Sequence, residues 1–355
     1  MTIVFTICSN NYLAQAITLG QSLLNNNPCY NFKIGLVDKK DISIDYDSIP
    51  FETVAVENIE IDEWDKMLLQ YNIQELNTAV KPFYFNYFIN LTDSCKKIIY
   101  LDPDILVYNS FYELENELEI NDIVVTPHIT IPINDGKFPR ESEFLSTGLY
   151  NLGFLAIKIS SNSQKMISWW AKRLKNMGYN DVKNGMFTDQ LWINFVPLFF
   201  ERVKLLVNPG YNMAYWNLQE RVIRVKEKCY FVNDYYPLVF FHFSGFSPTK
   251  PHEISKYQDR FFFSDRDDIV PLYQEYSKLL EFNNYNYFQS FKCHYTGIKE
   301  QHDETIVQAR IKKIPIQKRV IKKLIDYITK NFNIILDYRI FYDRGNLEDV
   351  NKYGK

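Results

Sequence analysis

The sequence predicts an α/β fold in which helices flank a mostly parallel central sheet. Residues 3–56 read as strand, helix, strand and strand, an order that is typical of parallel sheets. Residues 97–107 form an apolar run bounded by charge, which is the pattern of a strand buried on both faces. Residues 238–243 form a further apolar run and predict another buried strand.

The opening segment carries the first candidate binding residues. Apolar patterns predict its strands and its helix over residues 3–8, 13–23, 32–37 and 53–56. The polar turn after the first strand contains Asn11 and Tyr12. Such a turn can hydrogen-bond a base or a ribose, and the tyrosine ring can stack on a base. An ordinary turn that caps the following helix is the alternative.

Two carboxylates, Asp102 and Asp104, stand in the middle of the apolar run 97–107. Pro103 cannot donate to a sheet, so the strand is expected to stop there. Asp102 and Asp104 then emerge at the carboxyl end of the strand, where open α/β sheets bind ligands. Burying both charges requires a cation, and Mg²⁺ or Mn²⁺ would serve. An exposed Asp-Pro-Asp turn is the alternative.

The next segments supply a candidate lysine and a candidate lid. Residues 61–70 and 76–91 read as helices, the second interrupted at Lys81-Pro82. Lys81 precedes the central strand by one helix and can point back to the site, although a solvated lysine is the commoner case. After a helix at 111–118 and a strand at 123–126, residues 131–144 predict a long mobile loop that acts as a lid.

Three polar residues in the second half are further candidates. Asn151 lies in a strand pattern, residues 150–157, between two glycines that favour close backbone approach. A helix over 162–175 follows, and then Asp189 and Gln190. Asp189 either caps a helix or lies in the cleft.

His242 ends the apolar run 238–243. A histidine on an apolar strand is more often a hydrogen-bonded core residue than a ligand. With two aspartates that need a cation, it becomes a sensible third metal ligand.

The C-terminal part differs from the rest. Residues 266–355 predict a mainly helical extension of a main domain that spans residues 1–265. Within it, apolar residues recur on one side over residues 308–332, with lysine and arginine residues between them, which is typical of a basic amphipathic helix. Two interpretations stay open: the helix lies on an anionic membrane surface, or it packs on the domain or on a second subunit.

Composition excludes several classes of protein. The net charge is −3, which gives no reason to expect nucleic-acid binding. The first residues lack the basic start of a signal peptide, and no apolar run is long enough to span a bilayer. The five cysteines lack zinc-site spacing and indicate a reducing compartment. We therefore expect a cytoplasmic protein, with peripheral contact at the inner face of the cell membrane left open.

The motifs resemble, in order, those of glycosyltransferase family 8, which includes glycogenin and bacterial lipooligosaccharide galactosyltransferases. The resemblance covers residues 1–252 and rests on the segments 6–12, 81, 100–104, 150–153, 189–190 and 242–245. It implies a GT-A fold for the main domain, a nucleotide-sugar donor with UDP favoured, and a Mn²⁺ or Mg²⁺ ion. It also implies sugar transfer with retention of the anomeric configuration.

The resemblance assigns roles to individual residues. Asp102, Asp104 and His242 match the metal ligands of the family, and Asp102 also belongs to the donor site. The remaining donor-binding and catalytic residues are Thr6, Asn11 and Tyr12 at the base and ribose, Lys81 and Lys250 at the donor, and Asn151, Asp189 and Gln190 around the sugar. The family usually has Lys-Pro-Trp after the glycine, whereas this chain has Lys250-Pro251-His252, two positions later.

The expected function is a metal-dependent glycosyltransferase that builds a surface polysaccharide or glycan, as bacterial relatives do. The acceptor is expected to be a carbohydrate, a glycolipid or a glycoprotein. Two rivals stay open. One is a hydrolase that pairs Asp102 with Asp189. The other is a non-catalytic module that binds a nucleotide-sugar or a glycan within a larger synthase.

Overall fold

A computed structural model describes residues 1–91 and 94–313 of the 355-residue chain. Contacts divide the chain into a first compact unit, Met1–Gly297, and a second unit that begins at Ile298. Residues 266–297, which the sequence assigned to the C-terminal extension, belong to the first unit. The described part of the second unit is helix α11 (Ile298–Lys313). Most of the predicted basic helix over 308–332 lies outside the described residues.

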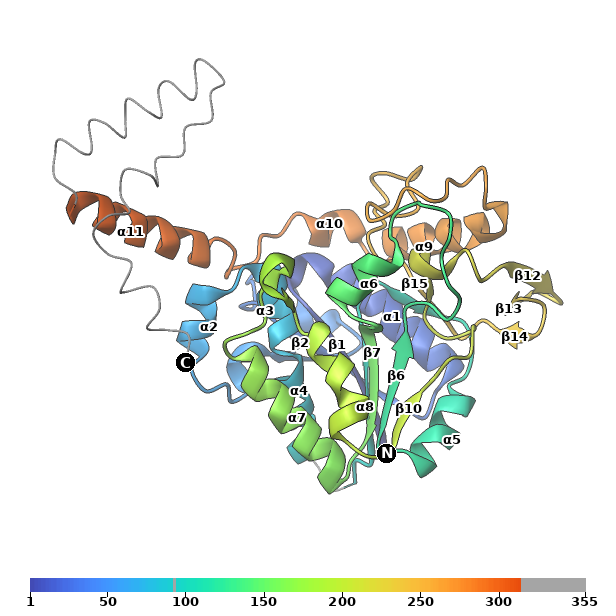
Figure 1. The fold of residues 1–355 in the computed structure, drawn as a ribbon, viewed down its shortest axis with the longest axis horizontal. Helices are drawn as coiled ribbons and strands as arrows, with labels where there is room; N and C mark the ends of the chain where they lie inside the picture. Colours follow the sequence, from blue (N-terminus) through green and yellow to red (C-terminus); the bar gives the residue numbers. More distant parts are fainter. Residues whose placement is uncertain (92–93, 314–355) are drawn as a thin grey trace, which may run out of the picture. The chain divides into compact units, whose positions relative to one another are not determined.

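The first unit is built on a seven-stranded sheet with the order β10-β6-β7-β4-β1-β2-β3 (Figure 1). Its strands are β1 (Thr2–Cys8), β2 (Asn31–Leu36), β3 (Glu52–Ala55), β4 (Lys97–Leu101), β6 (Ile123–Pro127), β7 (Tyr150–Lys158) and β10 (Val203–Leu205). Strand β7 runs antiparallel to both of its neighbours, and the other pairs are parallel. The predicted mostly parallel sheet is confirmed.

Smaller sheets flank the central one. Strand β5 (Ile105–Val107) pairs with β15 (Phe240–His242), which pairs with β11 (Met213–Ala214). The predicted run 97–107 is therefore divided between two sheets, on either side of Pro103. Two further small sheets contain β12 (Ile223–Lys226), β13 (Cys229–Val232) and β14 (Tyr236–Pro237), and β8 (Asn180–Asp181) with β9 (Met186–Phe187).

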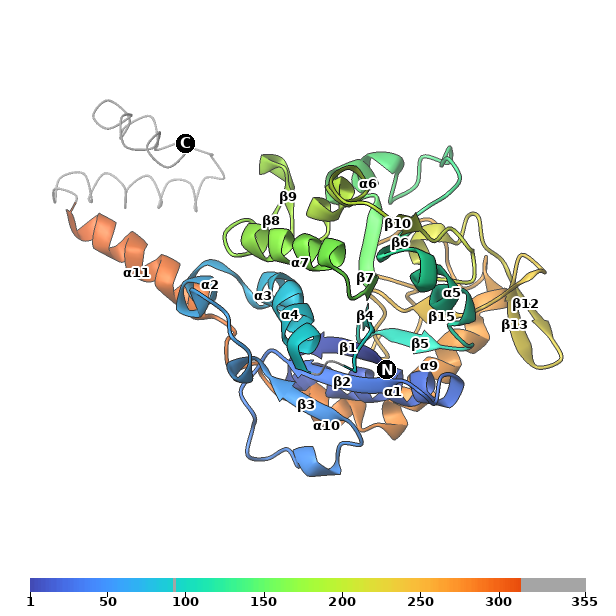
Figure 2. The same cartoon turned by 90° about the horizontal axis from the view of Figure 1, so that it is seen from below.

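Helices cover both faces of the central sheet (Figure 2). One face carries α4 (Lys81–Leu91) and α7 (Ser161–Leu174), and the other carries α1 (Leu13–Asn26), α9 (Val270–Phe282) and α10 (Tyr285–Gln289). The shorter helices of this unit are α2 (Trp64–Gln70), α3 (Ile73–Ala79), α5 (Tyr112–Ile120), α6 (Glu141–Thr147) and α8 (Val196–Phe199).

Alternation along β1 explains why both faces are apolar. Val4 points to the face of α1 and joins the large core there, whereas Phe5 points to the face of α4. On that second face Phe5 contacts the rings of Phe85, Phe88 and Tyr100, at centroid distances of 4.9, 5.0 and 5.2 Å. Both side chains are fully buried, so β1 is the inner strand that joins the two cores.

Several boundaries differ from the sequence prediction. The helix expected over 76–91 is two helices, α3 and α4, and begins at Ile73. The loop expected over 131–144 ends earlier, because α6 begins at Glu141. The carboxylate of Glu143 accepts from the backbone and the guanidinium of Arg140 and so closes the first turn of α6. The helix expected from residue 61 begins at Trp64. Among the described residues, no helix is both long and apolar enough to cross a bilayer.

The aromatic cluster under α4 predicts a stability effect. Phe5→Ala removes the ring that contacts both α4 and β4, and we expect it to lower the free energy of unfolding by about 3–5 kcal/mol. Chemical denaturation would measure this. The control, Tyr112→Ala, removes an aromatic ring that is 74% exposed, and should change stability by no more than about 0.5 kcal/mol. Equal effects of the two variants would contradict this account of the core.

Candidate active site

The candidate site lies at the ends of three neighbouring strands in the middle of the central sheet. Strands β1 and β4 end there, and β7 begins there because it runs in the opposite direction. The backbone N–H of Asp102 donates to the carbonyl of Gly153 (2.8 Å), which extends the pairing of β4 and β7 by one bond. Side chains from both strands are thereby brought to one place.

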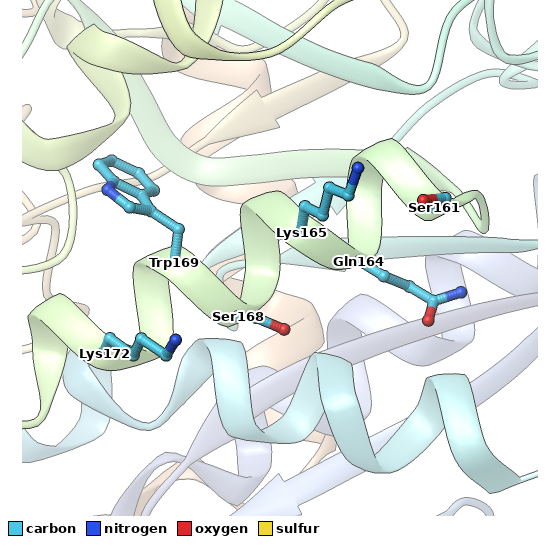
Figure 3. Close-up of a pocket in the computed structure, with 6 residues that line it drawn as sticks. All are labelled: Ser161, Gln164, Lys165, Ser168, Trp169 and Lys172. Atoms are coloured by element: carbon cyan, nitrogen blue, oxygen red, sulfur yellow. The ribbon is translucent and has the colours of Figure 1, made fainter.

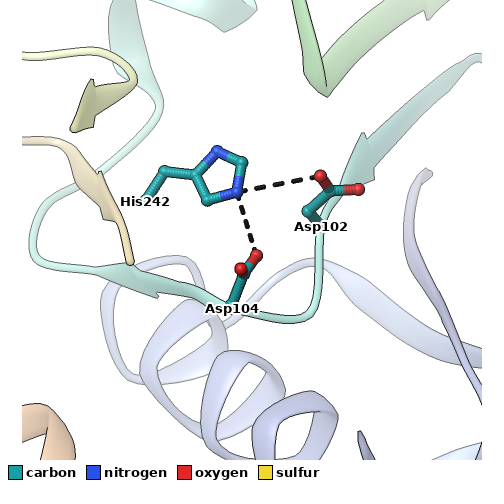
Figure 4. A group of neighbouring side chains, drawn as sticks. All are labelled: Asp102, Asp104 and His242. Atoms are coloured by element: carbon teal, nitrogen blue, oxygen red, sulfur yellow. Dashed lines mark ion pairs between the residues drawn. The ribbon is translucent and has the colours of Figure 1, made fainter. Parts of the chain in front are cut away.

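Asp102, Asp104 and His242 form a compact cluster (Figure 4). The Nε2 atom of His242 lies 2.9 Å from Oδ1 of Asp104 and 3.7 Å from Oδ2 of Asp102. One ligand atom from each of the three residues lies within 4.8 Å of the others. The imidazole is buried, and the two carboxylates are partly exposed.

Backbone pairing explains how residues 138 positions apart meet. His242 is the last residue of β15 and pairs with Ile105, the first residue of β5. Just beyond, the N–H of Phe243 donates to the carbonyl of Asp104 (2.8 Å). Gly153 leaves room for the imidazole, because a Cβ there would lie 2.3 Å from Cε1 of His242. Any side chain at residue 153 would therefore displace His242.

The donor set fits a hard divalent cation. Two carboxylates and a neutral imidazole suit Mn²⁺ or Mg²⁺, and the three face one another at a partly open position. Burial alone would lower the pKa of His242, but the carboxylates of Asp104 and Asp102 outweigh burial and raise it. A cation between these groups would compete with the proton on Nε2.

Lys81 links a third carboxylate, that of Asp189, to the cluster. As the first residue of α4, it is buried, and its Nζ lies 2.9 Å from Oδ2 of Asp189 and 3.4 Å from Oδ1 of Asp102. It also donates to the carbonyl of Leu152 (3.0 Å). Burial would lower the pKa of Lys81, but these carboxylates outweigh it and raise the pKa. Lys81 is therefore a fixed positive charge beside Asp102.

Asp189 lies behind Lys81 in a strained turn. The residue before it, Thr188, has a φ of 44°, which is unfavourable for a β-branched residue. The hydroxyl of Thr188 donates to Oδ1 of Asp189 (3.1 Å), and the indole N–H of Trp170 donates to its carbonyl (3.1 Å). The helix-capping alternative is not observed, since neither residue caps a helix by its side chain.

Asn151 and Gln190 fasten the start of β7. Gln190 donates to the carbonyl of Thr147 (2.9 Å) and accepts from the N–H of Leu152 (3.1 Å). The Oδ1 atom of Asn151 accepts from the N–H of Gly153 and from the amide of Asn212, and its amide group lies 3.3 Å from Nε2 of His128. Both residues thus support the site from within the fold.

A cavity of about 350 Å³ opens in front of the carboxylates. The predicted residues Asn11, Tyr12, Lys81, Asp102 and Asp104 line it. Thr6 does not: it is fully buried in β1. Lys250 is not brought to the cavity either. It lies on the surface, where its Nζ pairs with Glu253 at 3.3 Å.

Several residues of the site were not identified from the sequence. Helix α3 contributes Gln74, Asn77 and Thr78, and a later loop contributes Lys256 and Tyr257. Asn77 and Thr78 fall within the helix predicted over 76–91, where polar residues are a weak but usable signal, whereas Gln74 lies outside the predicted helices. Nothing in the sequence distinguished Lys256 from the other lysines.

A second cavity, of about 560 Å³, lies along one helix of the first unit (Figure 3). All of its lining side chains come from α7: Ser161, Gln164, Lys165, Ser168, Trp169 and Lys172. The lining contains no carboxylate and no residue of the metal cluster, so this cavity is separate from the candidate site.

Comparison with known proteins identifies the class and then the family. The sheet, its helices and the motif set at its edge define a glycosyltransferase with a GT-A fold, as predicted. The model of the family "Glycosyl transferase family 8" matches residues 3–253, and the chain belongs to this family. It is therefore a glycosyltransferase, and the prediction of an enzyme is confirmed.

The sequence relatives are distant. The chain is 25% identical to the uncharacterized protein YfnF of Bacillus subtilis over 206 residues, which are 57% of this chain and 65% of that protein. It is 21% identical to YfnD of the same organism over 255 residues, 70% of this chain and 79% of that protein. The chain thus spans slightly less than two thirds of the length of YfnF.

Solved structures with a similar fold include the galactosyltransferase LgtC in complex with donor and acceptor sugar analogs. It is 18% identical, with coverage of 79% of this chain and 95% of that chain and a TM-score of 0.48. The glycosyltransferase GlyE of Streptococcus pneumoniae TIGR4 is 17% identical, with coverage of 82% and 65% and a TM-score of 0.44.

The cluster predicts a measurable metal affinity. Asp104→Asn removes one anionic ligand while preserving the side-chain shape, and we expect at least a tenfold weaker binding of Mn²⁺. Titration calorimetry would measure it. Asp47→Asn, at an exposed aspartate that is not part of the cluster, serves as the control. Unchanged Mn²⁺ affinity in Asp104→Asn would argue against a metal site here.

His128 predicts a pH dependence of stability. Burial lowers the pKa of His128 from 6.5 to about 4, so between these values the unfolded state binds a proton that the folded state does not. Stability therefore rises with pH across this window, and His128 alone accounts for a loss of about 2 kcal/mol between pH 7 and pH 5.

Chemical denaturation of the wild type and of His128→Gln at pH 7 and pH 5 would test this. The variant should lose less stability on going to pH 5, because it lacks the contribution of His128. The exposed His252→Gln variant should retain it. If His128→Gln kept the full pH dependence of the wild type, the assignment of a neutral buried His128 would be wrong.

Proposed function

We propose that the protein transfers a sugar from a nucleotide-sugar, with a UDP-sugar favoured, to a carbohydrate, glycolipid or glycoprotein acceptor. The transfer depends on Mn²⁺ or Mg²⁺ and retains the anomeric configuration. The observation that carries the proposal is the cluster of Asp102, Asp104 and His242, whose two carboxylates line a cavity together with Asn11 and Tyr12. Membership of glycosyltransferase family 8 supports it.

In this proposal the cavity holds the nucleotide. Tyr12 is 44% exposed at its wall and offers a ring for stacking on the base, while Asn11 offers an amide for hydrogen bonds. Thr6 supports this wall from within β1. Asp102, Asp104 and His242 hold the ion. When bound, the ion neutralises the charge that develops on the departing diphosphate.

Lys81 and Asp189 act on the sugar side of the diphosphate. Lys81 is a buried cation within 3.4 Å of Asp102, so its charge is directed to the place where the phosphates would lie. Asp189, on the far side of Lys81, either stabilises positive charge at the anomeric carbon or attacks it as a nucleophile. Gln190 and Asn151 hold the start of β7 so that these groups keep their positions.

The acceptor is proposed to enter past residues 131–144 and the segment 211–216, in which Tyr215 is the partly exposed aromatic residue. A role in surface polysaccharide or glycan synthesis, and a cytoplasmic location, are part of the same proposal. Membrane contact or dimerisation through residues 308–332 also remains a proposal.

Donor turnover is the direct test. The protein would be incubated with Mn²⁺ and a panel of UDP-, GDP- and dTDP-sugars, and release of the nucleoside diphosphate would be measured. We expect release from one donor, and a loss of at least about a hundredfold with EDTA or in Asp104→Asn, since the bound ion contributes several kcal/mol. Asp47→Asn should retain activity.

Two outcomes would contradict the proposal. Binding of a nucleotide-sugar without turnover, over a range of acceptors, would favour the non-catalytic module. Release of the nucleoside diphosphate that persists in EDTA would show that the reaction does not depend on a metal ion. The anomeric configuration of the product, measured by NMR, tests retention separately.

A further inference from the structure

Lys256 lies where two cavities meet. Next to the cavity in front of the carboxylates, which is called the first cavity here, another cavity of about 380 Å³ lies under the loop that follows β15. The two cavities share five lining residues, which are Asn11, Tyr12, Asp104, Lys256 and Tyr257. A ligand that filled the first cavity and extended past Asp104 would therefore pass Lys256.

The charge of Lys256 is unpaired. The first cavity is lined by two lysines, and the carboxylates of Asp189 and Asp102 already surround the ammonium of Lys81. Within residues 1–91 and 94–313, the ammonium of Lys256 forms no ion pair, and it lies over the ring of Tyr257, 4.9 Å from the centroid. Of the two lysines in this lining, Lys256 is thus the one whose charge no carboxylate of the described residues neutralises.

Lys250 is placed differently. Its ammonium lies 3.3 and 3.5 Å from the two carboxylate oxygens of Glu253, and its side chain is 64% exposed. It lines neither of the two cavities. The lysine that the motif comparison favours is therefore directed into solvent.

The backbone of Lys256 is held by the loop that carries the metal ligand. Its N–H donates to the carbonyl of Gly245 (3.2 Å), three residues after His242. Gly245 has a φ of +75°, and a Cβ there would lie 2.5 Å from Oγ of Ser255 and 2.6 Å from the ring of Tyr257. Only glycine permits this approach, which fixes residues 255–257 against the metal site.

We propose that Lys256, in place of Lys250, binds the diphosphate of the nucleotide-sugar. The inference rests on the proposed function. In the transfer, the acceptor hydroxyl oxygen bonds to the anomeric carbon, and the bond from that carbon to the phosphate oxygen breaks with its electron pair on the phosphate. The hydroxyl proton leaves to the departing diphosphate or to solvent. Lys256 stays protonated and stabilises the charge on the diphosphate.

The test compares nucleoside diphosphate with nucleoside. Affinities for UDP, GDP and dTDP would be measured with Mn²⁺ by titration calorimetry, and the one that the wild type binds best would be used with its nucleoside. Lys256→Ala should weaken diphosphate binding by about ten- to a hundredfold and leave nucleoside binding within about twofold. Lys256→Arg should recover part of the loss. Lys250→Ala should stay within about twofold.

Lys228→Ala, an exposed lysine on the β12–β13 turn, is the matched control for loss of one positive charge. Unchanged diphosphate affinity in Lys256→Ala would overturn the inference, as would an equal loss in Lys250→Ala. Equal losses for the diphosphate and the nucleoside would indicate a structural effect and would also overturn it. If the wild type bound none of the three diphosphates, the proposed function itself would fail, which is a distinct result.

Discussion

The balance of charge at the end of β4 is the constraint on which the rest of the site depends. Asp102 and Asp104 place two negative charges at the end of a mostly buried strand, and Asp189 adds a third that is almost completely buried. Carboxylates in such a place require positive partners. Lys81 supplies one, and the open side facing His242 is suited to a cation. Strand order, the reversal of β7 and the approach of β15 all serve to bring these groups together.

Much of the fold could be predicted, because local patterns reflect it directly. The strand-helix-strand opening and the buried strand before Asp102 follow regular apolar patterns, and their ends agree with the structure to within three residues. The reversal of β7 could not be predicted, since a strand covered on both faces has the same composition in either direction. The packing of α9 and α10 against α1 was also missed, because it depends on contacts between distant residues such as Asn283 and Thr18.

The site divides in a similar way. The metal cluster could be predicted because two carboxylates directly after a buried strand need a cation to balance their charge. His242 was predicted as the third ligand for the same reason, and the family resemblance agreed. Lys81 was a weaker prediction that the geometry supports, because its ammonium lies between Asp102 and Asp189. The position of Lys256 could not be predicted from the sequence. It depends on the close approach at Gly245 and on a single backbone hydrogen bond, and neither of these produces a recognisable sequence motif.

The antiparallel pairing of β6 with β7 has a consequence for how such enzymes diversify. Both ends of the segment that joins these strands return to the same sheet edge, next to the predicted donor site. Residues can be added to or removed from this segment without shifting the register of either strand, because the pairing begins again at Tyr150. Under the proposed function the acceptor enters past this segment, so a change in its length alters the proposed acceptor site while the charges proposed to hold the donor stay in place.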